Sequence, residues 1–179
     1  MSAQLLLVAL GLIAVSGVPG LFFSRRSTAG ERAAAVLMVL GSALGLVVAF
    51  GAMTRTASFV HAWAVPGGEI AVRVDGLAAM FLVPLLVVAP LGAIYGLEYW
   101  PQRDHGDDGR KLRLFYGLQS AGIGLVLVAA NAVLFLLAWE TMALAAFFCT
   151  KAWGCGWPPT VIRSHPRSTR PMSACPTCG

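Results

Sequence analysis

One nearly uncharged stretch limits the folds open to this chain more than any other feature. Residues Leu114–Thr150 are 37 positions with a single charge, Glu140. A straight helix of that length would run about 55 Å at about 1.5 Å per residue, whereas a bilayer core is about 30 Å thick. We therefore expect the stretch to fold back once. Asparagine favours turns, so the turn is predicted at Ala130-Asn131, between helices at about 112–129 and 132–150.

Three earlier segments also have the length and composition of membrane-spanning helices. They are Ala3–Phe23, Ala33–Met53 and Gly76–Leu97, the last with Pro84 and Pro90 inside it. The chain is 58% hydrophobic and 12% charged, with a mean hydropathy of +0.76, whereas soluble domains carry about 25% charged residues. This composition excludes an ordinary soluble domain. It predicts an all-α, polytopic membrane bundle of about five helices over residues 1–150, embedded in the cell (inner) membrane.

The distribution of basic residues predicts how the bundle is oriented. The loop at 54–74 holds only Arg55 and Arg73. The remaining loops and the C-terminal segment are richer in basic residues, which favours the cytoplasmic side. Five spans with an outside N-terminus place all of them there. The net charge of +5 is thus read as a topology signal, and no nucleic-acid partner is predicted. The cytoplasmic basic residues would be Arg25, Arg26, Arg32, Arg103, Arg110, Lys111, Arg113, Lys151, Arg163, Arg167 and Arg170.

Small residues recur at a spacing of four in two of the expected helices. Gly41 and Gly45 form one pair, and Gly117 and Ala121 form another. Such pairs let helix backbones approach closely in membranes. Because glycine and alanine are abundant throughout the chain, we expect general tight packing and not a dedicated dimer motif.

The last 29 residues, 151–179, differ from the rest. They hold five of the ten prolines, three of the four cysteines and no acidic residue, and they show no helical or strand period. We expect a disordered tail. One alternative is a metal site of Cys155, His165, Cys175 and Cys178, in which Cys175-Pro-Thr-Cys178 has zinc-knuckle spacing. The other ligands are widely spaced, so no metal site is assigned. Another alternative is a foreign reading frame appended after a frameshift.

Glu140 is the candidate functional residue. A carboxyl group at the centre of a bilayer costs a few kcal/mol, and such residues usually face the bundle interior and pair. Desolvation favours the neutral acid, which can hold and release a proton. The alternative is a protonated glutamate that only hydrogen-bonds a neighbouring helix. No cofactor-binding residue is predicted.

Three features resemble the antiporter-like membrane subunits of proton-pumping NADH–quinone oxidoreductase, cation/proton antiporter complexes and membrane-bound hydrogenases. The first is the pair of opening helices followed by a polar outer loop. The second is VRVDGLAAMFLVPLL at 72–86, which is similar to the family's Asp-Gly-Leu entry into its third helix. The third is NAVLFLLAWETMALAAFF at 131–148, similar to the family's Asn, apolar run and Trp-Glu pair. Hydrogenase-4 component B and formate hydrogenlyase subunit 3 are the nearest types in this resemblance.

The resemblance implies a role for Glu140 and a limit on the chain. Glu140 would match the fifth-helix glutamate of the family's proton path, and Asp75 would cap or anchor the third helix. The family continues through further helices with buried lysines, so the chain resembles roughly the first third of a subunit. It would be a truncated proton-translocating subunit without a redox centre, assembled with other membrane subunits of a respiratory or hydrogenase complex. The alternative is a non-transporting membrane anchor with a metal-binding or interacting tail.

Overall fold

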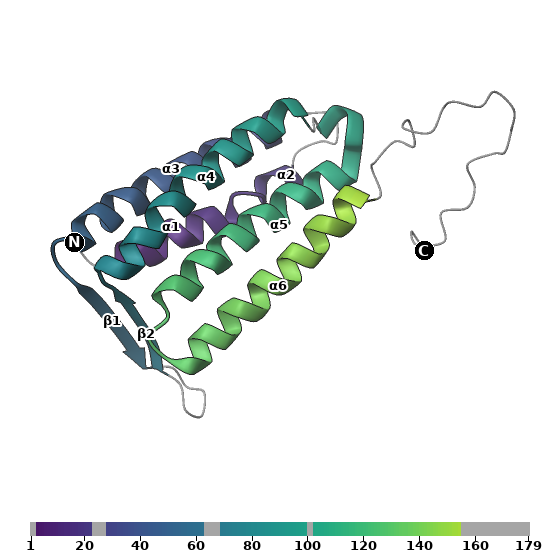
Figure 1. Cartoon of the computed structure of the whole chain (residues 1–179). Helices are drawn as coiled ribbons and strands as arrows, with labels where there is room; N and C mark the ends of the chain where they lie inside the picture. The colour runs from purple at the N-terminus through teal and green to yellow at the C-terminus, as the bar shows by residue number, and fades with distance from the viewer. Residues whose placement is uncertain (1–2, 23–27, 63–68, 100–101, 155–179) are drawn as a thin grey trace, which may run out of the picture.

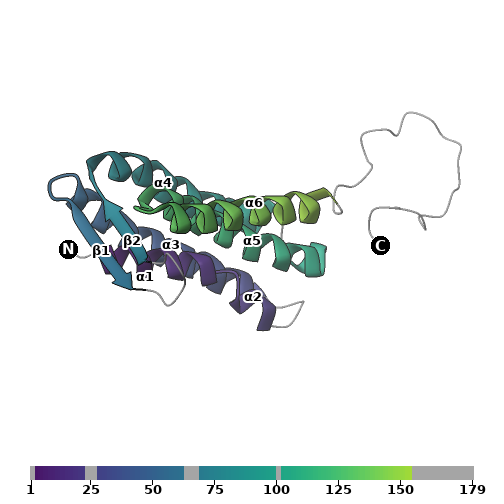
Figure 2. The same ribbon diagram turned by 90° about the horizontal axis from the view of Figure 1, so that it is seen from below.

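A computed structural model describes residues 3–22, 28–62, 69–99 and 102–154. It is an all-α bundle with a small β-hairpin at one end (Figure 1), which confirms the predicted fold class. The elements are α1 Ala3–Val15, α2 Pro19–Phe22, α3 Thr28–Ala52, β1 Ala57–Ala62, β2 Glu69–Val74, α4 Gly76–Tyr99, α5 Gln102–Val128 and α6 Ala132–Gly154. Seen from below, α1, α2 and α3 lie towards one side of the bundle and α4 and α6 towards the other (Figure 2).

The first predicted span is two helices, not one. The expected helix over Ala3–Phe23 breaks after Val15 and resumes at Pro19. Proline lacks the backbone N–H that a continuous helix needs, and it disfavours helical geometry in the residue before it. The Ser16 hydroxyl donates to the Ile13 carbonyl at 2.7 Å and so satisfies one of the carbonyls at the end of α1.

A hairpin replaces the loop expected between the second and third spans. β1 and β2 pair antiparallel, from Ala57 opposite Val74 to Ala62 opposite Glu69. Val72 and Val74 are buried, whereas Arg73 between them is exposed. This alternation covers the end of the bundle with the apolar face of β2. The period-2 pattern of these strands is short and lies among polar residues, so hydropathy alone indicates a loop here.

The predicted turn at Ala130-Asn131 is confirmed, and the hairpin holds it in place. α5 ends at Val128 and α6 begins at Ala132. The Ala130 N–H donates to the Ala71 carbonyl at 2.8 Å, beside an isolated bridge between Val72 and Ala129. The end of α5 and the start of α6 are therefore fixed against β2.

Three helix boundaries differ from those expected. α3 begins at Thr28 and not at Ala33, α5 begins at Gln102 and not near Leu112, and α6 continues to Gly154 past Thr150. In each case charged or polar residues extend a helix that hydropathy alone would end at the membrane boundary. α5 packs against α1, α3, α4 and α6, which makes it the central helix of the bundle.

The small-residue pairs serve packing within one chain. A methyl group on Gly41 would lie 2.8 Å from Cγ1 of Ile13 in α1, and one on Gly45 would lie 2.9 Å from Cδ1 of Leu86 in α4. A methyl group on Gly117 would lie 2.7 Å from the Ile13 carbonyl oxygen. The glycines thus let α1, α3, α4 and α5 approach closely. The core they enclose includes Leu6, Ile13, Met38, Val48, Leu82, Leu86 and Val128.

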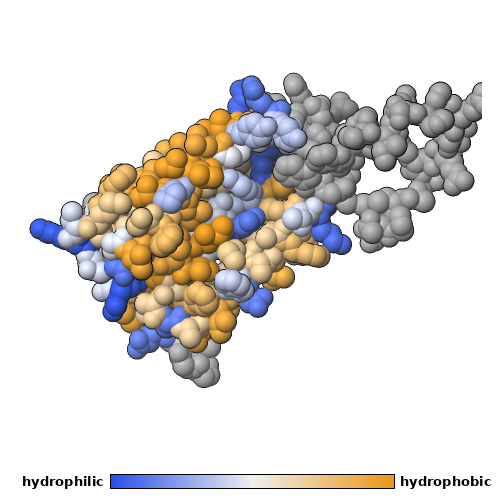
Figure 3. Space-filling model, viewed as in Figure 1, coloured by the Kyte–Doolittle hydropathy of each residue, from blue (hydrophilic) through white to orange (hydrophobic). Residues whose placement is uncertain are grey.

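Three of the described helices, α3, α4 and α6, are long and apolar enough to cross a membrane. α4 continues through Pro84 and Pro90, as expected for a membrane helix. α1 is apolar but shorter, and the first residues of α5 are polar. The surface in Figure 3 is largely hydrophobic along the helices, with more hydrophilic residues towards the ends. These features are those of a membrane protein.

Candidate functional site

Glu140 lies near the middle of Ala132–Lys151, the part of α6 that is long and apolar enough to cross a membrane, and on the exposed side of the helix. It follows the first residue of α6 by eight positions, or about 12 Å at about 1.5 Å per residue. The side chains one turn before and after it on the same face are also exposed, and all are apolar: Leu136, Leu137, Ala143 and Leu144. No hydrogen bond or ion pair joins Glu140 to another residue in the described part of the chain. The carboxyl group therefore points away from this bundle and not into it.

The opposite face of α6 fixes that direction. Leu134, Ala138 and Ala145 are buried, and α6 packs mainly against α5. A methyl group on Gly122 of α5 would lie 3.2 Å from Cα of Met142, so the two helices approach closely there. We expected the Glu140 side chain to face the bundle interior. In the described helices it faces outward instead.

The start of α6 is set by Asn131. Its side-chain oxygen Oδ1 accepts the Leu134 N–H at 2.8 Å, which is an N-cap bond, and its Nδ2 donates to the Glu69 carbonyl. One side chain thus caps the helix and ties it to β2. Asp75 does the expected capping at α4, where its Oδ1 accepts the Ala78 N–H at 2.8 Å.

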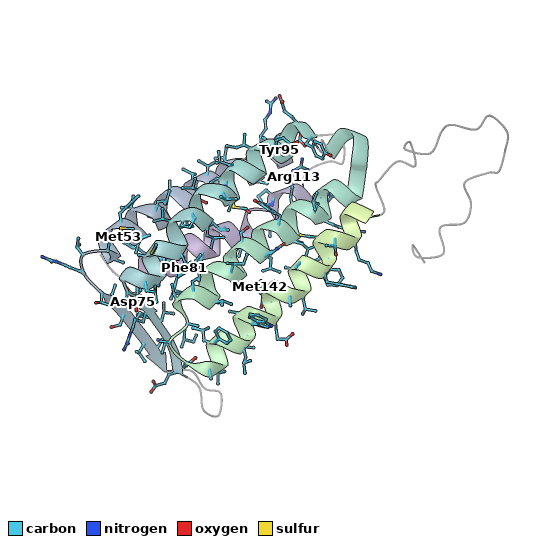
Figure 4. All side chains as sticks on the ribbon, viewed as in Figure 1. Met53, Asp75, Phe81, Tyr95, Arg113 and Met142 are labelled. Carbon is cyan, nitrogen blue, oxygen red and sulfur yellow. The ribbon has the colours of Figure 1, made fainter. Side chains whose placement is uncertain are left out.

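A second charged site lies at the other end of the bundle. Nη2 of Arg113 in α5 is 2.9 Å from Oε2 of Glu31 in α3, and the side chains are only 14% and 8% exposed. In Figure 4, Arg113 and Tyr95 lie at the end of the bundle opposite Asp75. Sequence reasoning had read Arg113 as a loop residue that orients the protein. The helix predicted at about 112–129 already contains Arg113 with Tyr116 and Gly117, which both face neighbouring helices, and this shared helix is the signal that could have placed Arg113 in the bundle.

A cavity of about 160 Å³ lies beside this ion pair. Its walls are mostly apolar, with few polar groups among them. The Tyr116 hydroxyl donates to the Ala89 carbonyl at 3.1 Å, which joins α5 to α4 one residue before Pro90. The lining residues include Ser16, Glu31, Met38, Gly92, Arg113 and Tyr116. The two charged side chains at its wall, Glu31 and Arg113, are paired with each other, and the rest of the wall is mostly apolar. The cavity therefore has no distinct polar site for a ligand.

The structure does not bring the two charged sites together. The thiol of Cys149 donates weakly to the Leu112 carbonyl at 4.0 Å, which places Cys149 level with the Arg113 end of α5. Glu140 is nine residues before Cys149, about 14 Å away along the axis at about 1.5 Å per residue. Among the described residues, no lysine or arginine side chain therefore lies level with Glu140 along the axis of α6.

Neither the histidine of the hairpin nor any proposed metal ligand is among the residues that the structure places in either charged site. His61 is exposed on β1, with its ring stacked 6.2 Å from that of Phe59. The proposed metal ligands Cys155, His165, Cys175 and Cys178 lie outside the described residues. Within the described ranges no group of three or more His, Cys, Asp or Glu side chains is arranged to hold a metal.

A scan against protein-family models matches no family, and a search of the curated proteins finds no significant match.

Proposed function

We propose that this chain is the N-terminal part of a proton-translocating membrane subunit of a redox-driven complex. The complex would be of the NADH–quinone oxidoreductase or membrane-bound hydrogenase type. The observation that carries the proposal is the position of Glu140: one carboxyl group near the middle of a helix that is long and apolar enough to cross a membrane, with apolar neighbours on the same face. The Trp139-Glu140 motif supports the choice of family.

Glu140 is the proposed proton-transfer group. Water is excluded at this depth, so the neutral acid is favoured until a cation approaches. An approaching cation then favours the carboxylate, and the proton leaves. Alternate loading and unloading of one carboxyl group in this way is what a proton relay requires.

Transport would need helices beyond those described. Among the described side chains, every lysine and arginine lies towards one end of the bundle or the other, at Arg32, Arg55, Arg73, Arg110, Lys111, Arg113 and Lys151. None is placed to unload Glu140. The exposed side of α6 is the surface on which later helices of the subunit, with their buried lysines, would pack.

The proposed orientation has the N-terminus and the hairpin outside. Arg110, Lys111, Arg113 and Lys151 lie at the end of the bundle opposite the hairpin. Concentration of basic residues on one side favours the cytoplasm. Glu140 would then be reached from the cytoplasmic end of α6 through about half of the membrane.

The test is to purify the tagged full chain from its own cells in a mild detergent. We expect membrane subunits of a quinone-reducing or hydrogenase complex to copurify. Glu140→Gln should leave this assembly intact and abolish most of the proton pumping that the complex performs. Glu98→Gln, an exposed acid at the end of α4, is the matched control and should pump normally. Unchanged pumping by the Glu140 variant, or purification without any redox-complex subunit, would contradict the proposal.

A further inference from the structure

The cavity beside the Glu31–Arg113 ion pair has a size and a lining that suit hydrocarbon better than water. Its volume is about 160 Å³ and its walls are mostly apolar. An apolar cavity of about 150 Å³ stays dry and binds a hydrocarbon such as benzene. The hydroxyls of Ser16 and Tyr116 at the wall donate to backbone carbonyls of the protein itself. A ligand in the cavity is therefore held by apolar contact.

The space exists because α3 and α4 bring only small side chains to this level. Those that line the cavity are Ala34, Ala35, Gly92, Ala93 and Gly96. A methyl group on Gly96 would meet no atom within 4 Å, whereas one on Gly45, further along α3, would lie 2.9 Å from Cδ1 of Leu86 in α4. The same two helices thus pack tightly at one level and stand apart at the other.

A wider hollow of about 690 Å³ adjoins the cavity, since Glu31, Tyr95 and Tyr99 line both. Tyr95 and Tyr99 are exposed, with their rings stacked 5.2 Å apart, and Figure 4 places Tyr95 at the same end of the bundle as Arg113. Exposed tyrosines near the end of a membrane helix mark the level of the lipid headgroups. The wider hollow is therefore at headgroup level, with the apolar cavity beside it.

We propose that the cavity holds one acyl chain of a phosphatidylethanolamine molecule whose headgroup lies in the wider hollow. Arg32 lines that hollow and is exposed, and no hydrogen bond or ion pair joins it to another residue in the described part of the chain. Its guanidinium is a suitable partner for the lipid phosphate.

The charge of the hollow selects the headgroup. Glu98 lines the same hollow as Arg32, so a headgroup that carries both a phosphate and an ammonium group matches it better than one with a net negative charge. The exposed rings of Tyr95 and Tyr99 also favour an ammonium group, through cation–π attraction. In the proposed orientation of the chain, this lipid belongs to the cytoplasmic leaflet.

The inference does not depend on proton transfer and is tested separately. The purified full chain in detergent is mixed with dioleoyl phosphatidylethanolamine, and mass spectrometry of the intact complex counts the lipids retained. We expect one per chain. Gly96→Leu should weaken retention about tenfold or more, because leucine takes the space of several methylene groups. Gly11→Leu, at an exposed position of α1 that also has no atom within 4 Å, is the matched control and should retain the lipid.

The headgroup contacts are tested in the same way. Arg32→Met should weaken retention about threefold to fivefold, the usual contribution of one exposed ion pair. Dioleoyl phosphatidylglycerol, which has the same chains but no ammonium group, should bind the natural chain about threefold less tightly or weaker still.

Photocrosslinking of the natural chain locates the acyl chain without any substitution. A phosphatidylethanolamine with a diazirine in its acyl chain should label residues 34–38 of α3 or 92–96 of α4. An excess of unlabelled lipid should remove that label. The proposal is overturned if the natural chain retains no phosphatidylethanolamine, or if Gly96→Leu retains as much as the natural chain. It is also overturned if phosphatidylglycerol binds as tightly, or if the label falls only outside these two segments.

Discussion

The Arg113–Glu31 ion pair is the most enclosed charged contact among the described residues. It joins α5 to α3 across 82 positions of sequence, and both side chains are largely buried. Arg113 Nη1 also donates to the Gly109 carbonyl at 3.3 Å. Removal of one member of such a pair leaves a buried charge without its counterion.

We predict that Arg113→Met lowers the free energy of unfolding by about 3 kcal/mol, because the buried Glu31 carboxylate loses its guanidinium partner. The double variant Arg113→Met with Glu31→Leu should regain most of this loss, since neither charge of the pair remains. Arg32→Met, at an exposed position beside Glu31, is the control and should change stability little. Unfolding in mixed micelles measures all three. Equal losses for the single and double variants would show that the pair is not the source of the effect.

Residues whose roles are local were predictable, and residues whose roles depend on distant partners were not. Asn131 and Asp75 act on backbone groups three residues away, so turn and cap preferences were enough to place them. The mid-helix depth of Glu140 followed from the length of the apolar run. Its direction, away from the bundle, did not, because it depends on which face of α6 packs on α5. The Glu31–Arg113 contact depends on how α3 and α5 pack, which hydropathy does not encode.

At the scale of the elements, glycines decide how closely the helices approach. Gly117 of α5 faces the end of α1, where a methyl group would lie 2.6 Å from Oγ of Ser16 and 2.7 Å from the Ile13 carbonyl oxygen. The second of these neighbours is backbone and can move only if the helix moves. Gly11 on α1 has no atom within 4 Å of the same position.

Gly117→Ala should therefore destabilise the bundle by about 1–3 kcal/mol, the usual cost of overpacking. Gly11→Ala should be neutral or slightly stabilising, since alanine favours helix and meets no clash. The comparison uses the same unfolding measurement for both. A loss for Gly11→Ala as large as that for Gly117→Ala would mean that glycine flexibility matters, and not close packing.

The turn between α5 and α6 has its own test. Asn131→Ala removes the cap on the Leu134 N–H and the bond to the Glu69 carbonyl, and should cost about 1 kcal/mol or more. Asn131→Asp keeps the cap acceptor but loses the amide donor. We expect hydrogen exchange at Leu134 to quicken in the alanine variant and to stay slow in the aspartate variant. Fast exchange in both would show that the bond to Glu69, and not the cap, orders the start of α6.

Among the secondary-structure elements, the sequence predicted the presence of the helices more accurately than the residues at which they begin and end. The turn at Ala130-Asn131 was found because one helix cannot be twice the membrane thickness. The break before Pro19 was not predicted, although proline is a strong signal, because the run around it carries no charge and has the length of one membrane span. The hairpin was missed because each strand is six residues long and only one of its faces is covered.

At the scale of the whole molecule, the two ends of the bundle differ in charge. The hairpin end carries the exposed residues Arg55, His61 and Arg73, and the opposite end carries several more basic residues from α3, α5 and α6. The membrane should therefore separate His61 from Lys111. This arrangement follows from packing of helices in alternate directions, and its orientation follows from charge.

In intact cells, a membrane-impermeant thiol reagent should label His61→Cys and spare Lys111→Cys in a chain without other cysteines. Both positions are exposed in the structure, so access depends on the side of the membrane alone. Permeabilised cells provide the control, in which both positions should react. Labelling of position 111 but not 61 in intact cells would reverse the proposed orientation.

The central claim is that Glu140 holds a proton inside the membrane, and infrared spectroscopy of the full chain in lipid vesicles tests it most directly. The spectrum of Glu140→Gln is subtracted from that of the natural chain at pH 7, so that only this carboxyl group remains in the difference. We predict the stretching band of a neutral carboxylic acid, because desolvation favours the protonated form at mid-membrane. The bands of an ionised carboxylate in its place would contradict the account.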